Sequence, residues 1–574
     1  MNTQKNLARF GTEAMHQRIE QLIRTGLKAL EASGVLPESA QDATFTVERP
    51  REVSHGDVAT NVAMVLAKDA GVSPRELAGG LAECLADEIA LDEWVAKLEI
   101  AGPGFINFRL TPRYQCELLR AVRSAQFGRW PEKSGPRVLV EFVSANPTGP
   151  MLVVQARAAA LGDVLCTLLE RTGAVATREY YVNDAGGQLE KLGASLEARI
   201  RQQQGEDQPV PEEGYPGDYL IEMAQQYLRE HPDFDPPTDD KRMRHRALGR
   251  FAADIIVEEQ RDLLVQYGVV FDSWYRESVV RESGEPEKVL ALLSDKGYLY
   301  EAGGARWLRS TDFGDDKDRV LVKQDGGYTY LLPDLAYHKG KFDRGHDHLI
   351  DIWGPDHHGY IARMGAGLAA LGYDPKAFEV LISQWVRLLR GDEEIRMSKR
   401  SGDFITMRAL LDEVGRDAAR FLFLMRSPDS PLDFDLELAK TQSQENPVYY
   451  AQYAHARIAS VLENARQKGM EIPEPHALSY EQLGRLTMPE ERELIRRLGD
   501  FPGELQQAAR AREPHRVAAY VLDLAARFHV FYTECRILGT DVELTQARLY
   551  LAAATAGIIR ECLEILGVSA PLEM

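Results

Sequence analysis

The stretch 141-EFVSANPTGPMLVVQARAAALGDVL-165 decides the fold, because it predicts a strand, a turn and a helix in that order. Apolar residues 138–143 supply the strand, and good helix formers fill positions 156–168. A strand that passes through Gly and Pro into a helix commonly presents the helix N-terminus to an anion. The first turn of this helix nevertheless offers Leu152, Val153, Val154 and Gln155, of which only Gln155 can donate a hydrogen bond from its side chain. The sequence therefore predicts a phosphate-binding corner with an apolar lining.

Bulk properties indicate a large multidomain enzyme. The chain has 574 residues, too many for one hydrophobic core, with 44% hydrophobic and 27% charged residues. A net charge of −20 argues against a general nucleic-acid coat, although a local basic face can still bind RNA. The five cysteines lack CxxC spacing, and no run of about 18 apolar residues occurs. We expect a soluble cytoplasmic protein without a zinc site, a disulfide framework or a membrane span.

The pattern of apolar residues changes twice along the chain. Residues 1–125 combine helical spacing with the strand pair KLEIAGPGFINFRL and predict a small α+β domain. Residues 126–440 alternate short strands with helices, which favours a parallel sheet covered on both faces, with an insertion near 195–290. Residues 441–574 show helical spacing throughout and predict an all-α bundle. In the central domain, strands are expected at RVLVEFV, TREYYV, HLIDIWG and FEVLISQWVRLL, with a hairpin turn at 325–327.

Several polar clusters fall where a doubly wound sheet carries its ligand site. The short loop RMSKRSG, which starts at Arg396, can bring the Lys399 ammonium to a phosphate chain, although a solvated loop explains the same composition. Asp356 and His357 follow the strand HLIDIW and point toward the carboxyl edge of the sheet. A metal site is a competing interpretation, but His357 and His358 cannot both face one ion from a regular helix.

A further pair of polar residues begins the helix after 328-YTY. Tyr330 and Asp334 lie four residues apart at this strand-to-helix junction. An aspartate there can bind a guanidinium in a bidentate manner while the tyrosine ring covers the aliphatic stem. Helix capping by Asp334 explains the same residue without a ligand. Capping is likewise a sufficient explanation for Asn183 and Asp184 in 180-YYVNDAGGQLEKL.

Taken in order, these stretches resemble the arginyl-tRNA synthetases, a family of class I aminoacyl-tRNA synthetases. SHGDVATNVA and IAGPGFINF resemble its N-terminal tRNA-binding domain, and NPVYYAQYAHARI resembles the start of its helical anticodon-binding domain. Five stretches resemble the family's catalytic domain: VEFVSANPTGP, YYVNDAGGQLEKL, YLLPDLAYHKGKF, IWGPDHHGY and RMSKRSGDF. The resemblance implies a Rossmann-type class I catalytic domain, an α+β N-terminal add-on domain and a C-terminal helical anticodon-binding bundle.

The resemblance also implies an activity and a set of site residues. The expected reaction is ATP-dependent activation of L-arginine to arginyl-adenylate, followed by transfer to the 3′ end of tRNA(Arg). Mg²⁺ would arrive with ATP, bound mainly through its phosphates, and no fixed protein metal site is expected. Arginine binding is implied for Glu141, Asn146, Tyr330 and Asp334. ATP binding is implied for Leu152, Val154, Gln155, Gly354, Asp356, His357, Met397 and Lys399. A role in catalysis is implied for Gln155, Arg396, Ser398 and Lys399.

One motif departs from the family pattern. Arginyl members typically read PLHVGHGR where this chain reads PMLVVQAR, so Leu152 and Gln155 replace two histidines and Val154 replaces a glycine. The histidines donate to the phosphates in the transition state, and loss of one such donor costs on the order of 10²–10³ in rate. Three hypotheses stay open at this stage. They are a working synthetase with compensating changes, a paralogue that binds tRNA or arginine without efficient adenylation, and a repurposed ligase.

Contacts to tRNA are expected in the C-terminal bundle. Arginines at 496, 497 and 510 cluster there, and Tyr449 and Tyr453 can stack on splayed anticodon bases. Solvated helix faces and buried tyrosines explain the same residues without RNA. The expected partners are therefore tRNA(Arg), L-arginine and ATP, with no membrane, and we expect a monomer.

Overall fold

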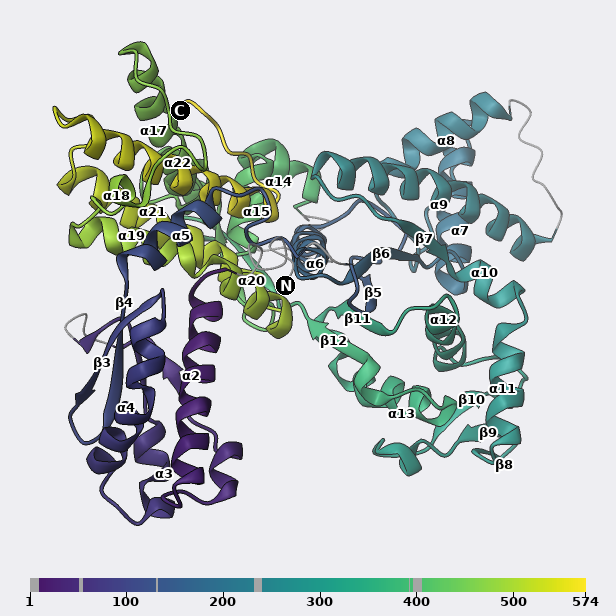
Figure 1. Ribbon diagram of the computed structural model, residues 1–574. Coiled ribbons are helices and arrows are strands. Elements are labelled where there is room, and N and C mark those ends of the chain that lie inside the picture. Colours follow the sequence, from purple (N-terminus) through teal and green to yellow (C-terminus); the bar gives the residue numbers. More distant parts are fainter. Residues whose placement is uncertain (1–9, 51–54, 131–132, 232–239, 392, 396–404) are drawn as a thin grey trace.

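The computed structural model describes residues 10–50, 55–130, 133–231, 240–391, 393–395 and 405–574. An N-terminal domain lies against a C-terminal helical bundle, and the bundle packs against one side of a central α/β domain (Figure 1). Within those ranges, no helix combines the length and the apolar character that a membrane crossing requires. The predicted multidomain α/β plus all-α architecture is confirmed.

The N-terminal domain consists of helices packed on an antiparallel sheet. The strands lie in the order β1 (Val47–Glu48), β2 (Val58–Thr60), β4 (Phe105–Leu110) and β3 (Val95–Ala101). The helices are α2 (Thr12–Ala32), η1 (Glu38–Asp42), α3 (Val62–Ala70) and α4 (Pro74–Leu91). Helix α2 buries Met15, Ile19 and Leu22 at the spacing of one helical face, and Ser73 caps α4 through a reciprocal bond with Glu76.

The central domain is built on a five-stranded parallel sheet. Its order is β12 (Phe378–Ile382), β11 (His348–Trp353), β5 (Arg137–Glu141), β6 (Val175–Val182) and β7 (Ser273–Arg276). Strand β5 lies at the centre and is buried on both faces, which explains its continuous apolar run. The chain order reverses between β5 and β11, and ligands of doubly wound sheets bind at the carboxyl ends of strands at such a switch point.

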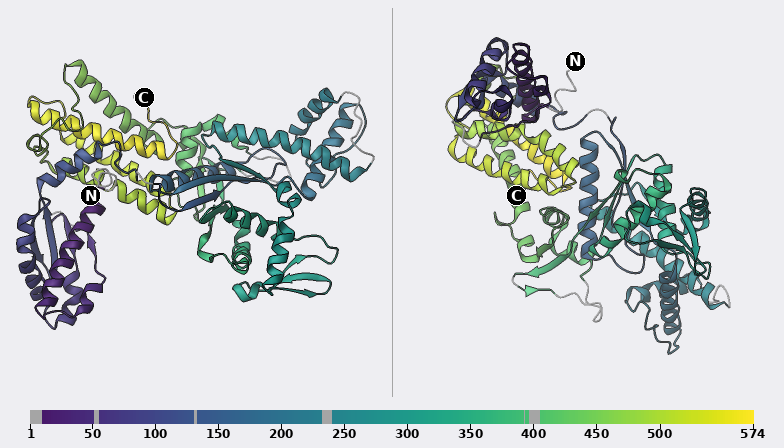
Figure 2. Two further views of the ribbon diagram at one scale, coloured as in Figure 1. Left: turned by 45° about the vertical axis from the view of Figure 1, so that its right-hand side comes forward. Right: turned by 90° about the horizontal axis from the view of Figure 1, so that it is seen from below.

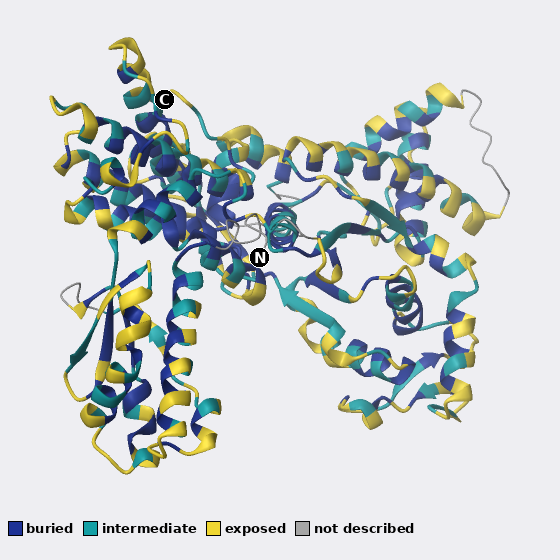
Figure 3. Ribbon diagram, viewed as in Figure 1, coloured by how far each residue is buried: buried dark blue, intermediate teal, exposed yellow. Residues whose placement is uncertain are grey.

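Helix α6 (Val153–Arg171) runs back along the sheet after β5. A Cβ atom at Gly162 would lie 2.2 Å from the Phe142 ring, so glycine is what allows the helix to approach the strand closely. The helix is almost entirely enclosed, and Figure 3 shows it dark blue between the sheet and the bundle. The predicted strand–turn–helix unit is present as expected.

The insertion forms a helical unit that projects from the far end of the sheet (Figure 2). It contains α7 (Gly187–Gln203), α8 (Tyr219–Glu230) and α9 (Lys241–Gln266). Beyond it, α10 (Glu277–Glu282) and α11 (Glu285–Asp295) lead to a small sheet of β8 (Leu299–Ala302), β9 (Ala305–Leu308) and β10 (Arg319–Val322), with η3 (Ser310–Phe313) between β9 and β10. The hairpin expected at 325–327 is a tight turn, in which Val322 pairs with Tyr328 as an isolated bridge.

The prediction of one strand over 378–389 was wrong. The segment divides into β12 in the main sheet and β13 (Val386–Arg390) in a second sheet with β14 (Glu393–Glu394) and β15 (Leu432–Asp435). The chain passes from one sheet to the other between Ser383 and Gln384. The Ser383 N–H still donates to the Trp353 carbonyl at the end of β11, whereas the Gln384 N–H donates to the Pro428 carbonyl. The other elements near the sheet are α12 (Leu331–Asp343), η4 (Pro355–Tyr360), α13 (Ile361–Leu371), η5 (Pro375–Ala377), α14 (Met407–Val414), α15 (Arg416–Phe423) and α16 (Leu436–Lys440).

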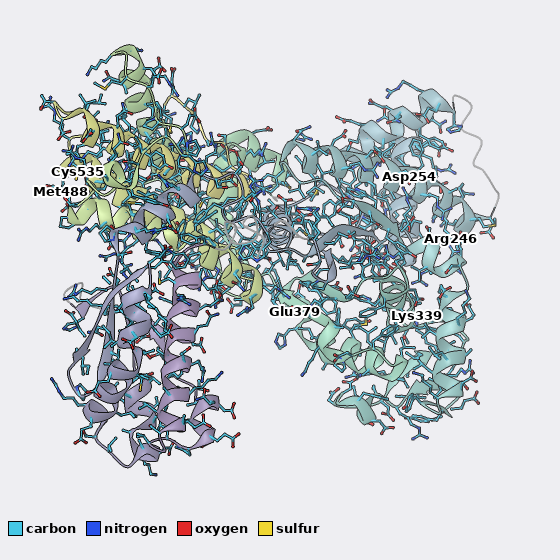
Figure 4. All side chains as sticks on the ribbon, viewed as in Figure 1. Arg246, Asp254, Lys339, Glu379, Met488 and Cys535 are labelled. Atoms are coloured by element: carbon cyan, nitrogen blue, oxygen red, sulfur yellow. The ribbon has the colours of Figure 1, made fainter. Side chains whose placement is uncertain are left out.

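The C-terminal bundle packs against both other domains. Its helices are α17 (Pro447–Gln467), α18 (Tyr480–Leu483), α19 (Pro489–Gly499), α20 (Phe501–Ala511), α21 (His515–Glu534) and α22 (Val542–Ile565). Helix α20 packs on α6, and α5 (Pro112–Val122), which follows the N-terminal sheet, packs on α19 and α22. Glu379, labelled in Figure 4, lies on β12 and accepts from Arg512 Nε at 3.1 Å, so an ion pair links the main sheet to the bundle.

Candidate active site

The start of α6 is held by the side chain of Gln155. Its Oε1 atom accepts from the Leu152 N–H at 2.8 Å, which closes a bond from the third helical residue back to the cap. This bond fixes the orientation of the amide and leaves the NH₂ group of Gln155 as a donor. Leu152 and Val154 are partly exposed beside it, whereas Val153 is fully buried. The corner therefore keeps one side-chain donor and the backbone N–H groups of a helix N-terminus.

The segment after residue 404 lies against this corner. Leu152 forms an isolated antiparallel bridge with Thr406, and the Met407 N–H donates to the Met151 carbonyl at 2.8 Å. The predicted loop residues Arg396, Met397, Ser398 and Lys399 lie outside the described residues.

Arg157 connects helix α6 to neighbouring loops through buried hydrogen bonds. Its guanidinium is fully buried and donates to the carbonyls of Gln384, Ser427 and Ser430 at 2.8 to 2.9 Å. Burial lowers the pKa of Arg157 to about 10, so the group stays charged at neutral pH. The Arg157 side chain thus links α6 to Gln384, between β12 and β13, and to the loop that precedes β15. This is the arginine that the sequence retains in an otherwise altered motif.

The turn after β5 is strained. Val143 and Ser144 adopt φ values of 69° and 38°, and the Ser144 N–H donates to the Phe142 carbonyl two residues back. Such backbone is costly for a β-branched residue and persists only where the surroundings fix it. Here Ser144 Oγ donates to Glu141 Oε1 at 2.9 Å and accepts from the Tyr181 N–H at 3.0 Å. The strained turn lies directly after the carboxyl end of β5, where the connection to α6 begins.

A cleft of about 540 Å³ opens at the switch point between β5 and β11. Six of the predicted substrate residues line it: Glu141, Asn146, Tyr330, Asp334, Gly354 and His357. Leu152, Val154 and Gln155 belong to the adjacent corner and not to this lining, and Asp356 is exposed outside it. The cleft therefore gathers the residues predicted for arginine, together with part of those predicted for ATP.

A buried lysine pairs with two of the acids that line the cleft. Lys341 is fully buried, and its Nζ lies 2.6 Å from Glu141 Oε2 and 2.9 Å from Asp351 Oδ1. Burial by itself lowers the pKa of Lys341, but the charges of Asp351 and Glu141 outweigh it and raise the pKa. His338 completes the group through a bond of 2.7 Å between its Nε2 and Asp351 Oδ2. Glu141 is thus already paired before any substrate arrives.

Asp334 differs from the other acids of the cleft. Tyr360 donates to its Oδ2 at 2.7 Å, but within the described part of the chain it forms no ion pair. Glu277, by comparison, is paired with Arg281. Burial raises the pKa of Asp334 to about 6, and the nearby charges of Glu277 and Glu141 add to the rise. The carboxylate is thus destabilised in the empty cleft and would be stabilised by a cation.

A metal ion does not fit this arrangement. Among the described residues, Glu141, His338 and Asp351 form the one group with ligand atoms close enough together to hold a metal. The Lys341 ammonium, however, lies within hydrogen-bond distance of both acids. A divalent ion there would have to displace a buried cation that is already paired, which is unfavourable.

Sequence reasoning missed Lys341, His338, Tyr181 and Tyr360. The spacing of Asp334, His338 and Lys341 at i, i+4 and i+7 places all three on one face of α12, and that pattern was a usable signal. No local pattern distinguishes Tyr181 or Tyr360 from ordinary core tyrosines, because their role depends on which strands become neighbours.

The residues predicted to contact tRNA have different environments. Tyr449 and Tyr453 are half-buried and stack with ring centroids 6.1 Å apart at 10°, and Arg510 is exposed. Arg496 reaches Asp57 of the N-terminal domain at 3.6 Å. Arg497 pairs with Asp500, Glu504 and Asp523 and covers the Tyr520 ring. The tyrosines and Arg510 are therefore available for RNA, whereas Arg497 is engaged within the protein, and all five contacts stay predictions.

Comparisons with known proteins agree along the whole chain. Three family models match: the arginyl tRNA synthetase N terminal domain over residues 17–110, the catalytic domain of class I (R) tRNA synthetases over 122–460, and the DALR anticodon binding domain over 451–574. An arginine–tRNA ligase of Desulforudis audaxviator is 47% identical, covering 97% of this chain and 98% of its own length. One from Shouchella clausii is 46% identical, covering 98% and 100%. The arginyl-tRNA synthetase structure of Thermus thermophilus, 22% identical, superposes with a TM-score of 0.75 over 97% of this chain and 100% of that one.

Proposed function

The chain belongs to the arginyl-tRNA synthetase family, and from this premise we propose that it is an arginine–tRNA ligase that activates L-arginine with ATP and charges tRNA(Arg). The observation that carries the proposal is Asp334. Its carboxylate faces the cleft with a raised pKa and without an ion-pair partner in the described chain. A guanidinium supplies the missing charge and the planar donors that a carboxylate binds best.

The other residues proposed to bind arginine line the same cleft as Asp334. Tyr330 is the N-cap residue of α12 and is 77% exposed, so its ring is free to cover the substrate stem. Asn146, which follows the strained turn, is exposed and also lines the cleft. Glu141 is a buried residue of the cleft wall, and we propose that it stays paired with Lys341 when arginine binds. We propose that these residues position arginine while Asp334 provides the principal charge contact.

ATP is proposed to bind at the corner formed by the start of α6. The Gln155 NH₂ and the helix N-terminus offer neutral and partial positive groups to its phosphates. Gly354 and His357 line the same cleft and are proposed to contact the adenosine, and Lys399 is proposed to neutralise the leaving pyrophosphate. Mg²⁺ is proposed to accompany ATP through the phosphates, since no cluster of the described residues accommodates it. The protein is further proposed to act as a cytoplasmic monomer on tRNA bound by the bundle.

Arginine-dependent exchange of pyrophosphate into ATP, measured with and without tRNA(Arg), tests the proposal. Exchange at rates ordinary for a synthetase would exclude the alternative of a protein that binds tRNA or arginine without efficient activation. Tight tRNA binding without exchange would overturn the proposal.

The triple variant Leu152→His, Val154→Gly, Gln155→His examines the altered motif directly. It is expected to raise the exchange rate by about 10² or more, because it restores two transition-state donors. The single change Val154→Gly is the matched control, since it opens space without adding a donor.

A further inference from the structure

Tyr181 on β6 lines the cleft and carries a buried hydroxyl without a hydrogen-bond partner among the described residues. Its side chain is among those that line the cavity, and its hydroxyl oxygen is buried without a hydrogen-bond partner in the described part of the chain. A buried hydroxyl without a partner is costly, so such groups in a native structure are normally satisfied by a ligand or by ordered water. The hydroxyl therefore belongs to a side chain of the cleft wall and has no partner of its own in the described chain.

The position of the Tyr181 ring is fixed by the sheet. The strand β6 pairs with β5 on one side and β7 on the other, and the Tyr181 N–H donates to Ser144 Oγ at 3.0 Å. The ring packs on Tyr337 with centroids 4.4 Å apart. The hydroxyl therefore cannot turn away to find a partner elsewhere without disturbing the strained turn or the aromatic packing.

The surrounding charges define what kind of group can approach. Burial raises the pKa of the Tyr181 phenol, and the charges of Glu277, Asp334 and Glu141 raise it further. The phenol consequently stays neutral, and its oxygen lies in the field of three carboxylates. Such a field repels an anionic group and favours a cationic N–H donor.

We propose that Tyr181 Oη accepts an N–H of the substrate guanidinium and is a specificity-determining residue for arginine. The inference rests on the proposed function. A guanidinium carries five N–H donors, more than Asp334 alone can accept. Glu141 and Glu277 already have Lys341 and Arg281 as partners. The Tyr181 hydroxyl is an acceptor in the wall of the cleft that has no partner among the described residues.

The test compares two single-atom deletions in the full-length protein. Tyr181→Phe removes the unpaired hydroxyl, and Tyr275→Phe makes the same change at the residue paired with it in register on β7, which does not line the cleft. Titration calorimetry with L-arginine should show affinity weakened about tenfold or more in Tyr181→Phe and unchanged in Tyr275→Phe, since a hydrogen bond to a charged group is lost only in the first. In exchange assays, the KM for arginine should rise while the KM for ATP stays constant.

Thermal unfolding provides the second readout. Because the hydroxyl has no partner in the free protein, Tyr181→Phe should leave Tm unchanged or raise it. Unchanged arginine affinity in Tyr181→Phe would overturn this inference and leave the proposed function standing. A Tm lowered by several degrees, or equal affinity losses in both variants, would also overturn it, because either result assigns the hydroxyl a structural role. Absence of arginine binding by the wild type would overturn the inference and the proposed function together.

Discussion

Replacing Asp334 by Asn should stabilise the ligand-free protein at pH 7 while removing its affinity for arginine. In the folded protein the pKa of Asp334 is raised from its ordinary value of 3.8 to about 6. An acid with a raised folded pKa loses its proton first in the unfolded state, so stability falls as pH rises from 3.8 toward 6. Above pH 6 the full penalty is present. Asn cannot ionise and therefore escapes the penalty, and its amide oxygen can still accept from Tyr360.

The magnitude follows from the difference between the two pKa values. At roughly 1.4 kcal/mol for each tenfold change in proton affinity, the penalty at pH 7 is about 3 kcal/mol, and at pH 5 it is about 1.6 kcal/mol. Asp334 also lies in the first turn of α12, where a negative charge stabilises the helix by about 0.5 kcal/mol. The net gain in unfolding free energy expected for Asp334→Asn is therefore about 2.5 kcal/mol at pH 7. At pH 5 the folded carboxyl is mostly protonated and has little charge to interact with the helix, so the expected gain is about 1.6 kcal/mol.

Calorimetric unfolding of the free protein at both pH values measures this gain. Because three domains need not unfold together, hydrogen exchange of the α12 amides provides a local measure of the same change. Asp351→Asn is the control, since this isosteric change weakens the pairs with Lys341 and His338 and should lower stability. A loss of stability in Asp334→Asn at pH 7, or an equal gain at both pH values, would refute the reasoning.

Three further outcomes follow from the same contacts. Lys341→Met should destabilise the catalytic domain by roughly 3–5 kcal/mol in thermal unfolding, because it leaves two buried acids without their cation, and a loss below about 1 kcal/mol would contradict the pairing described. Arginine affinity of the wild type, followed by calorimetry, should fall about tenfold from pH 7 to pH 5 as Asp334 takes up a proton; a flat profile would exclude Asp334 as the anchor. Gln155→Glu keeps the acceptor for the Leu152 N–H but replaces the NH₂ by a negative charge, so it should slow pyrophosphate exchange more than Gln155→Ala; wild-type exchange rates in both variants would show that the amide donates nothing to ATP.

The strand–turn–helix from Arg137 to Arg171 and the helices of the bundle could be predicted because their patterns are local. Apolar spacing is set by burial on one face of a helix or on both faces of a central strand, and it survives in the sequence alone. The same reasoning failed for 378–389, since nothing local indicates that the chain leaves one sheet for another at Ser383. That change is decided by carbonyl groups of Trp353 and Pro428.

The sequence by itself determined the domains, the family resemblance and the identity of the acids, including the Tyr330 and Asp334 pair. Only the tertiary structure decided what each acid does. Glu141 meets Lys341 across 200 residues because β5 and α12 converge at the switch point, and this contact gives Glu141 a cationic partner. Asp334 meets no such cation in the described chain and keeps a raised pKa. Charge and burial depend on distances in space, and those distances exist only once the sheet has brought remote segments together.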